Sequence, residues 1–189
     1  MSLQGFRGEV NDYSLQLARS NILRKVPRFI RNQADHLTYQ AAGYGHLRAI
    51  IDNFTSHSES ITCIETNEPF TFAIKLMGGV AINQLGKIDW VKLVEPPEDR
   101  SFVGISALNF HVDSVDTLVS RFETGNYNVQ YDDSQPGVVA VRLNQHGQTV
   151  NFVERRLEDD TGEAVESGLA VPIHPRQLSE PEGVRSQES

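Results

Sequence analysis

The chain has 189 residues, of which 39% are hydrophobic and 22% charged, as in an ordinary globular protein of one compact domain or two small packed halves. Its formal net charge is −8, and the segment 158–189 carries −6 of this charge, so the rest of the chain is nearly neutral. No basic cluster stands out in that body. Because phosphate binding requires clustered Lys and Arg, the composition predicts neither nucleic acid nor an anionic membrane as a partner.

The single cysteine, Cys63, cannot form an internal disulfide, and this is typical of a reducing compartment. No apolar run reaches the roughly 18 residues of a transmembrane helix, and the N-terminus lacks the apolar core of a signal peptide. We therefore expect a cytoplasmic protein.

The first predicted element is a helical region over residues 1–33, which we expect to pack on the main body. Apolar residues recur there at approximately helical spacing, and Pro27 predicts a break near Val26. The apolar positions are Leu15, Ile22, Leu23, Val26, Phe29 and Ile30.

The middle of the chain contains an internal repeat, which is the strongest signal in the sequence. Three segments with the alternation of a strand recur in the same order. Residues 36–40 match 107–111 at an offset of 71, residues 72–76 match 139–143 at an offset of 67, and residues 91–95 match 150–154 at an offset of 59. The repeat predicts two βαβββ modules, over residues 34–97 and 98–157.

Each module is expected to have a helix after its first strand. In the second module the apolar residues Val115, Leu118, Val119 and Phe122 lie on one helical face. Asp113 or Ser114 is the expected N-cap, and Gly125 the expected stop. In the first module the matching helix carries Tyr44, Leu47 and Ile51.

The second strands of the modules are predicted at residues 61–65 and 128–132. The first module has eight extra residues before its last strand, around 77–83, which we expect to form a glycine-containing loop. After the second module, residues 158–189 are acidic and poor in large apolar side chains, so we expect a flexible, disordered tail.

Paired βαβββ units with a histidine on the first strand resemble the vicinal oxygen chelate superfamily, which includes glyoxalase I, bleomycin-resistance proteins and extradiol dioxygenases. The resemblance covers about residues 34–156. Its motifs are Asp35-His36-Leu37, Leu93-Val94-Glu95-Pro96 and the helix entry Val112-Asp113-Ser114-Val115-Asp116. The N-terminal helical region is also similar to YecM-like metal-binding proteins. The resemblance implies an α+β fold, in which the two repeats form a curved mixed sheet around a pocket.

The resemblance also implies a divalent metal, held by residues on the first and last strands of each unit. The four matching positions are His36, Lys92, Ala107 and Asn151. Only His36 is a competent ligand among them, and Lys92 would repel a cation. The usual metal site is therefore incomplete in this sequence.

Strand alternation predicts which side chains face the pocket, because residues i and i+2 of a strand share one face. If Leu37 and Leu108 point toward the helices, the opposite face of the sheet is unusually polar. The predicted ligand-binding residues on that face are His36, Thr38, Lys75, Trp90, Lys92, Asn109, His111, Arg142 and Asn151.

Three functions remain open from the sequence. The first is binding of a small polar or anionic molecule by the cationic and amide side chains of this face. The second is a divalent-metal-dependent lyase, isomerase or dioxygenase, with His36, His111 and a carboxylate from Glu95 or Glu154 as ligands, although the two glutamates need a bulge or a twisted strand end to turn inward. The third is a non-catalytic interaction module whose sheet edges pair with another chain, including a possible homodimer.

Overall fold

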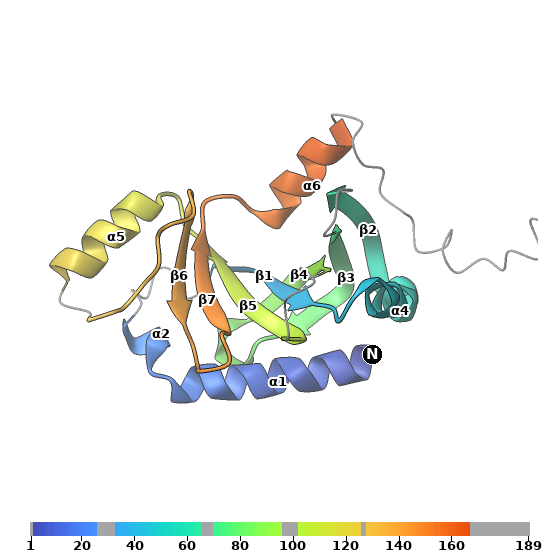
Figure 1. The fold of residues 1–189 in the computed structure, drawn as a ribbon, viewed down its shortest axis with the longest axis horizontal. Coiled ribbons are helices and arrows are strands. Elements are labelled where there is room, and N and C mark those ends of the chain that lie inside the picture. The colour runs from blue at the N-terminus through green and yellow to red at the C-terminus, as the bar shows by residue number, and fades with distance from the viewer. Residues whose placement is uncertain (1, 26–32, 66–69, 96–101, 126–127, 167–189) are drawn as a thin grey trace, which may run out of the picture.

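The computed structural model describes residues 2–25, 33–65, 70–95, 102–125 and 128–166 (Figure 1). Within these residues the centre is one curved mixed sheet with the strand order β2-β3-β4-β1-β5-β7-β6. The strands are β1 (Ala34–Gln40), β2 (Ser58–Glu65), β3 (Thr71–Ala81), β4 (Lys87–Val94), β5 (Gly104–His111), β6 (Val138–Arg142) and β7 (Thr149–Val153). The helices are α1 (Leu3–Arg19), α2 (Ile22–Lys25), α4 (Tyr44–Phe54), α5 (Val115–Thr124) and α6 (Leu157–Glu166), with short 3₁₀ turns η1 (Thr55–His57) and η2 (Asn83–Leu85). The predicted α+β fold is confirmed.

The strand register confirms the internal repeat at all three offsets. Strands β1 and β5 pair antiparallel, with Leu37 opposite Leu108, its counterpart 71 residues later. Parallel pairs flank this centre, with Val91 of β4 opposite Leu37 and Val150 of β7 opposite Leu108. The outer strands repeat the pattern in the pairs Ile74–Val91 and Val141–Val150. A pseudo-twofold axis therefore passes between Leu37 and Leu108. The predicted module boundary at 97/98 itself lies outside the described residues.

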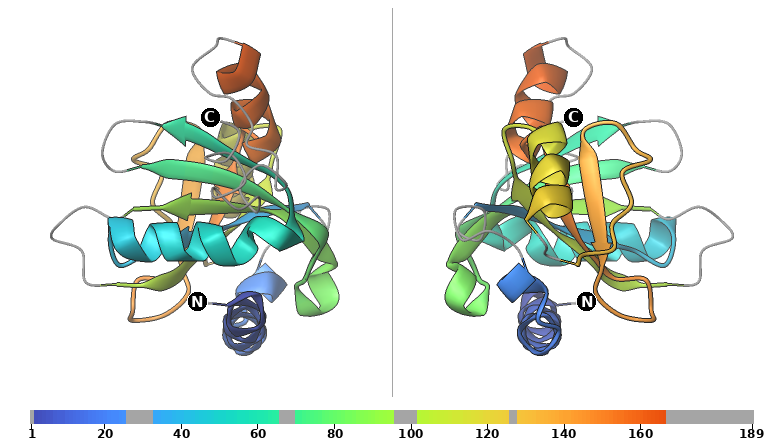
Figure 2. Two further views of the ribbon diagram at one scale, coloured as in Figure 1. Left: turned by 90° about the vertical axis from the view of Figure 1, so that its right-hand side faces the viewer. Right: turned by 90° about the vertical axis from the view of Figure 1, so that its left-hand side faces the viewer.

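One face of the sheet carries the hydrophobic core, and α1, α4 and α5 cover it. Leu37, Leu108 and Phe152 are completely buried on this face, as the strand alternation predicts. Phe6 of α1 packs edge-on against the rings of Tyr39 and of Phe54 in α4, and Phe122 of α5 packs against Phe152. Figure 2 shows α1 and α6 on opposite sides of the sheet, so the second face is left for α6 and for the cavity described below.

Helix α1 packs through residues spaced by three and four positions, as an amphipathic helix requires. Its buried side chains are Phe6, Val10, Tyr13, Ser14 and Leu17. Leu15 is 50% exposed, so its predicted place on the apolar face is wrong. Ile22 in α2 is buried as predicted. Val26, Phe29 and Ile30 of the predicted set lie outside the described residues, as does the predicted break at Pro27.

The hydroxyl of Tyr13 joins α1 to the sheet interior. It donates to the carbonyl of Thr149 at 2.6 Å and accepts from the backbone N–H of Leu108 at 3.2 Å. In a regular parallel ladder with Leu108 opposite Val150, the Leu108 N–H would donate directly to Thr149. The phenol is therefore inserted into the ladder between β5 and β7 and satisfies both strands.

The extra residues of the first module do not form the predicted loop. They lengthen the β3–β4 hairpin, since β3 runs on to Ala81 and pairs again with β4 after an irregularity between Lys75 and Val80. Two glycines with positive φ, Gly78 at 73° and Gly79 at 65°, allow this bulge. A Cβ on Gly79 would come within 2.8 Å of the Ile88 carbonyl oxygen, so the partner strand also requires glycine there.

Two further predictions need correction. Residues 128–132 form no strand in the part of the chain that the structure describes, and only an isolated bridge joins Asp132 to Ala140. The beginning of the predicted acidic tail is helix α6, which buries Leu157, Thr161 and Ala164. The remainder of that tail, residues 167–189, lies outside the described residues. Ser114 is the N-cap of α5 as predicted, and its hydroxyl accepts from the N–H of Thr117.

Among the described residues, no helix is long and apolar enough to cross a membrane.

Candidate functional site

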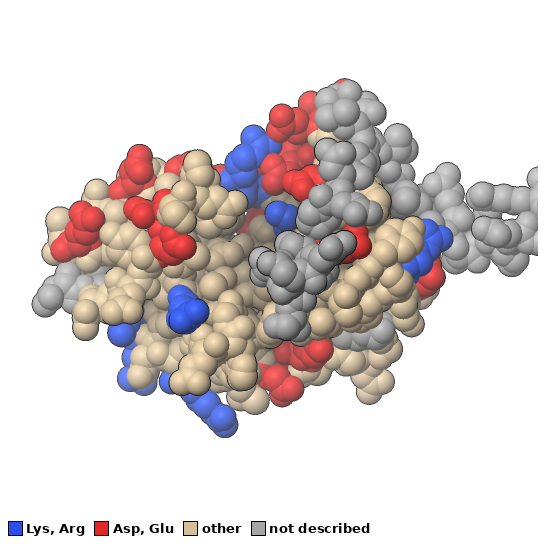
Figure 3. Space-filling view, in the orientation of Figure 1, with Lys and Arg blue, Asp and Glu red and all other residues tan. Residues whose placement is uncertain are grey.

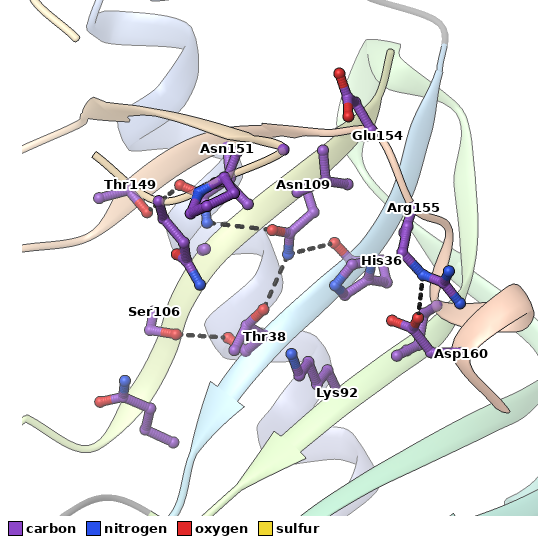
Figure 4. Close-up of a pocket in the computed structure, with 18 of the residues that line it drawn as sticks. His36, Thr38, Lys92, Ser106, Asn109, Thr149, Asn151, Glu154, Arg155 and Asp160 are labelled. Carbon is purple, nitrogen blue, oxygen red and sulfur yellow. Dashed lines mark hydrogen bonds and ion pairs between the residues drawn. The ribbon is translucent and has the colours of Figure 1, made fainter. Parts of the chain in front are cut away.

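A cavity of about 710 Å³ lies on the polar face of the sheet, opposite the core. Strands β1, β4, β5 and β7 form its floor, residues 135–137 lie along one wall, and α6 begins at its rim. Of the predicted ligand-binding residues, the five that line this cavity are His36, Thr38, Lys92, Asn109 and Asn151. Figure 4 shows their side chains on the same side of the sheet, so the strand alternation predicted this part of the site.

A chain of hydrogen bonds fixes the amides on the cavity floor. Thr149 donates to the Asn151 side-chain oxygen at 2.8 Å, and Asn151 donates in turn to Asn109 Oδ1 at 3.2 Å. Asn109 is only 3% exposed, and its Nδ2 donates to Thr38 Oγ1 at 2.9 Å and to the His36 carbonyl at 3.2 Å (Figure 4). Because a satisfied polar network is rigid, the floor is pre-formed.

Two β-bulges bring residues to this face that strand alternation alone would turn away. In β1, Ala34 pairs with Phe110 and His36 pairs with Asn109, so Asp35 is an extra residue. In β5, Thr38 pairs with Ala107 and Tyr39 with Ile105, so Ser106 is extra. Asp35 and Ser106 are counterparts at the offset of 71, so both halves have the same bulge. A bulge re-aims side chains, which explains why Asp35 can contact the neighbouring His36 and why Ser106 lines the cavity.

Asp35 and His36 form a buried dyad next to the cavity. The His36 Nδ1–H donates to Asp35 Oδ2 at 2.8 Å, and the same oxygen accepts from the Leu157 N–H of α6 at 3.0 Å. Burial lowers the pKa of His36 below its ordinary value of 6.5, although Asp35 opposes this effect. For Asp35, burial raises the pKa, but the hydrogen bonds from His36 and Leu157 outweigh it and leave the pKa below 3.8. At neutral pH the dyad is therefore a neutral imidazole beside a carboxylate.

The cavity holds two side-chain cations, and only one has a carboxylate partner among the described residues. Arg155 at the rim bonds to Asp160 at 2.7 Å and also to Glu163. Lys92 of β4 lines the floor near Thr38, and it has no ion pair in the described part of the chain.

Figure 3 shows basic and acidic side chains side by side where α6 begins. Four further residues at or beside the cavity could not be predicted from the sequence, because neither a β-bulge nor the position of α6 produces a periodic pattern. They are Asp35, Ser106, Arg155 and Asp160.

The other predicted site residues lie elsewhere. The Lys75 ammonium lies over the ring of Trp90, 5.8 Å from its centroid, and forms an ion pair with Glu59. Neither Lys75 nor Trp90 lines the cavity. His111 lines a separate hollow of about 200 Å³ at the start of α5. Arg142 borders a third hollow beside α2. The expectation that these four side chains share the cavity with His36 is therefore wrong.

The residues present do not fit the divalent metal that the resemblance implies. Of the proposed ligands, His36 and Glu154 border the cavity, whereas His111 lies in the separate hollow. Glu95 accepts weakly from the Phe70 N–H, at 3.5 Å, and Glu154 accepts from the Val115 N–H at the start of α5. No group of three or more His, Cys, Asp or Glu side chains that could hold a metal occurs in the described residues.

The duplicated strand order places a cavity on one face of the sheet and helices α1, α4 and α5 on the other. This arrangement agrees with the α+β fold, a curved mixed sheet beside a pocket, that the sequence resemblance implies. No protein-family model matches the chain, and no curated protein matches it.

The solved structures similar to this chain include a structural-genomics protein named EC4020. It is 15% identical, with a TM-score of 0.64, over 85% of this chain and 92% of EC4020. A methylmalonyl-CoA epimerase from Streptomyces coelicolor is also 15% identical, over 64% of this chain and 95% of the epimerase, with a TM-score of 0.43. The likeness to EC4020 is one of fold alone.

Proposed function

We propose that the cavity binds a small polar or anionic molecule. The observation that carries this proposal is Lys92, a cation without a carboxylate partner in the described chain, in the same cavity as the ordered amides of Asn109 and Asn151. Ligand sites typically combine a concave surface with a few fixed polar groups, and a cavity of about 710 Å³ has the size of a small-molecule site.

A second observation supports a ligand in this cavity. The Gln40 Oε1 atom is buried and has no hydrogen-bond partner among the described residues, and Gln40 lines the cavity. Buried polar atoms are rarely left without a partner in folded proteins, because the loss of hydration is costly. A ligand or an ordered water that donates a hydrogen bond there would satisfy this oxygen.

Thermal unfolding with a panel of carboxylate and phosphate metabolites tests the proposal. A ligand at one hundred times its Kd stabilises the folded state by about 2.7 kcal/mol. For a chain of this size that corresponds to a Tm increase of roughly 5–10 °C.

Lys92→Met should remove most of the Tm increase. Lys87→Met is the matched control, since Lys87 is an exposed residue of the same strand outside the cavity. If the two variants lose the increase equally, or if no compound of the panel gives one, the cavity is not a binding site of this kind.

The non-catalytic interaction module, the homodimer and the cytoplasmic location stay predictions. Light scattering on the purified protein would decide the oligomeric state.

A further inference from the structure

The His36 ring carries an acceptor that the described protein leaves unused. Its Nδ1–H is committed to Asp35, and Asp35 is held in place by the N–H of Leu157, so the ring is fixed in one tautomer. The remaining nitrogen, Nε2, is then an acceptor. It makes no hydrogen bond within the described residues, although the residue is 6% exposed and lines the cavity. An unpaired acceptor on a residue that lines a cavity suits a ligand that donates a hydrogen bond.

Lys92 lies within reach of the same ligand. In the parallel register of β1 and β4, His36 is opposite Trp90 and Thr38 is opposite Lys92. Lys92 is therefore one strand across and two residues along from His36, about 8 Å between backbone positions by ordinary strand spacing. Both side chains extend over the same cavity (Figure 4). A ligand with two to four atoms between its oxyanion and its donor can touch both groups.

The charges around the cavity decide which anion fits. Asp35, Glu154 and Asp160 are carboxylates beside or at the edge of the cavity, and Lys92 is the cation without a carboxylate partner in the described chain. One such cation among carboxylates favours a monoanion over a phosphate dianion, since like charges repel at short range. A carboxylate is the common monoanion that a lysine binds.

The donor that reaches Nε2 should be a hydroxyl. One neutral acceptor nitrogen satisfies one donor, whereas an ammonium group brings three donors and a positive charge close to Lys92. A hydroxyl brings one donor and no charge, so it matches the site.

We infer that the ligand of this cavity is a small 2- or 3-hydroxy carboxylate, with its carboxylate on Lys92 and its hydroxyl donating to His36 Nε2. This inference rests on the proposed function, because it names the ligand class of the same cavity. The Asp35–His36 dyad acts here as the specificity element, and Lys92 as the anchor.

Matched pairs of acids test the inference by NMR titration at pH 8, where His36 is neutral. The pairs are lactate with propionate and 3-hydroxybutyrate with butyrate, which differ only in the hydroxyl. In the wild-type protein the hydroxy acid of at least one pair should bind about tenfold more tightly, because its analogue cannot donate a hydrogen bond to Nε2 and keeps water away from it.

Variants separate the two roles. His36→Leu should bring the affinity ratio to about one without weakening the analogue, whereas Lys92→Met should weaken both members of the pair. His57→Gln, at an exposed histidine outside the cavity, should leave the ratio unchanged. If His36→Leu does not fold, the ¹⁵N resonance of Nε2 in the wild-type protein replaces it: addition of the hydroxy acid should shift it, and the analogue should not.

Equal affinities within both pairs would overturn the inference and leave the proposed function standing, since the acids still bind. Binding of none of the four acids also overturns it. The metabolite panel then decides the proposed function separately, because a phosphate or another polar compound can still raise the Tm.

Discussion

The hydroxyl of Tyr13 provides a sharp test of how the sheet below the cavity is held together. Tyr13→Phe removes one oxygen and leaves two buried backbone groups without partners, the Leu108 N–H and the Thr149 carbonyl. An unsatisfied buried polar group costs about 1–3 kcal/mol, and removal of the buried hydroxyl itself recovers part of that cost. We therefore expect the free energy of unfolding to fall by about 2–4 kcal/mol.

Urea unfolding followed by fluorescence or circular dichroism measures this change. Tyr131→Phe is the matched control, because the Tyr131 hydroxyl donates to Glu123 at 3.2 Å on the exposed surface. The control should change the free energy of unfolding by less than about 0.5 kcal/mol. If Tyr13→Phe is equally mild, β5 and β7 can form the direct ladder bond without the phenol, and the reasoning about the inserted hydroxyl is wrong.

Two further predictions concern the hairpin and the dyad. Gly79→Ala should lower the free energy of unfolding by about 2–3 kcal/mol through positive φ and a clash with the opposite strand, whereas Gly78→Ala, with open space around it, should cost only about 1 kcal/mol. If urea unfolding gives the same loss of unfolding free energy for Gly79→Ala and Gly78→Ala, the clash with the opposite strand does not contribute. Because the folded pKa of His36 lies below 6.5, the unfolded chain takes up a proton first, so stability should fall as the pH drops below about 6.5, by at most about 1.4 kcal/mol per pH unit. The slope should decrease in His36→Leu but persist in His57→Gln, at an exposed histidine, and a pH-independent wild-type protein between pH 5 and 7 would contradict the buried neutral histidine.

The sequence predicted the arrangement of the sheet well, because strand alternation is a local pattern and the repeat is visible as a match between two segments of the same chain. The matched segments occupy equivalent positions in the two halves of the sheet, and the alternation correctly placed Leu37 and Phe152 in the core and Asn109 and Asn151 in the cavity. These properties follow from a period of two residues and need no knowledge of tertiary contacts.

Features that depend on tertiary geometry could not be predicted. Asp35 bonds to His36 and Ser106 lines the cavity because each strand has one extra residue at that position, and a bulge has no composition of its own. His111 and Arg142 have the parity of cavity residues, but they stand at strand ends that border other hollows. Helix α6 looked like a tail because its acidic sequence is polar; its stabilising contacts are the buried Leu157 and the bond to Asp35.

The pseudo-twofold axis between Leu37 and Leu108 also bears on the direction in which a molecule can lie in the cavity. Two identical halves would place the same side chains at both ends of the cavity, and a ligand could then bind in either of two orientations. Here the counterparts of His36 and Lys92 are Ala107 and Asn151, so imidazole and ammonium occur at one end only. Divergence of the two copies has thus made the two ends of the cavity chemically different, and a ligand with unlike ends would bind in one preferred orientation.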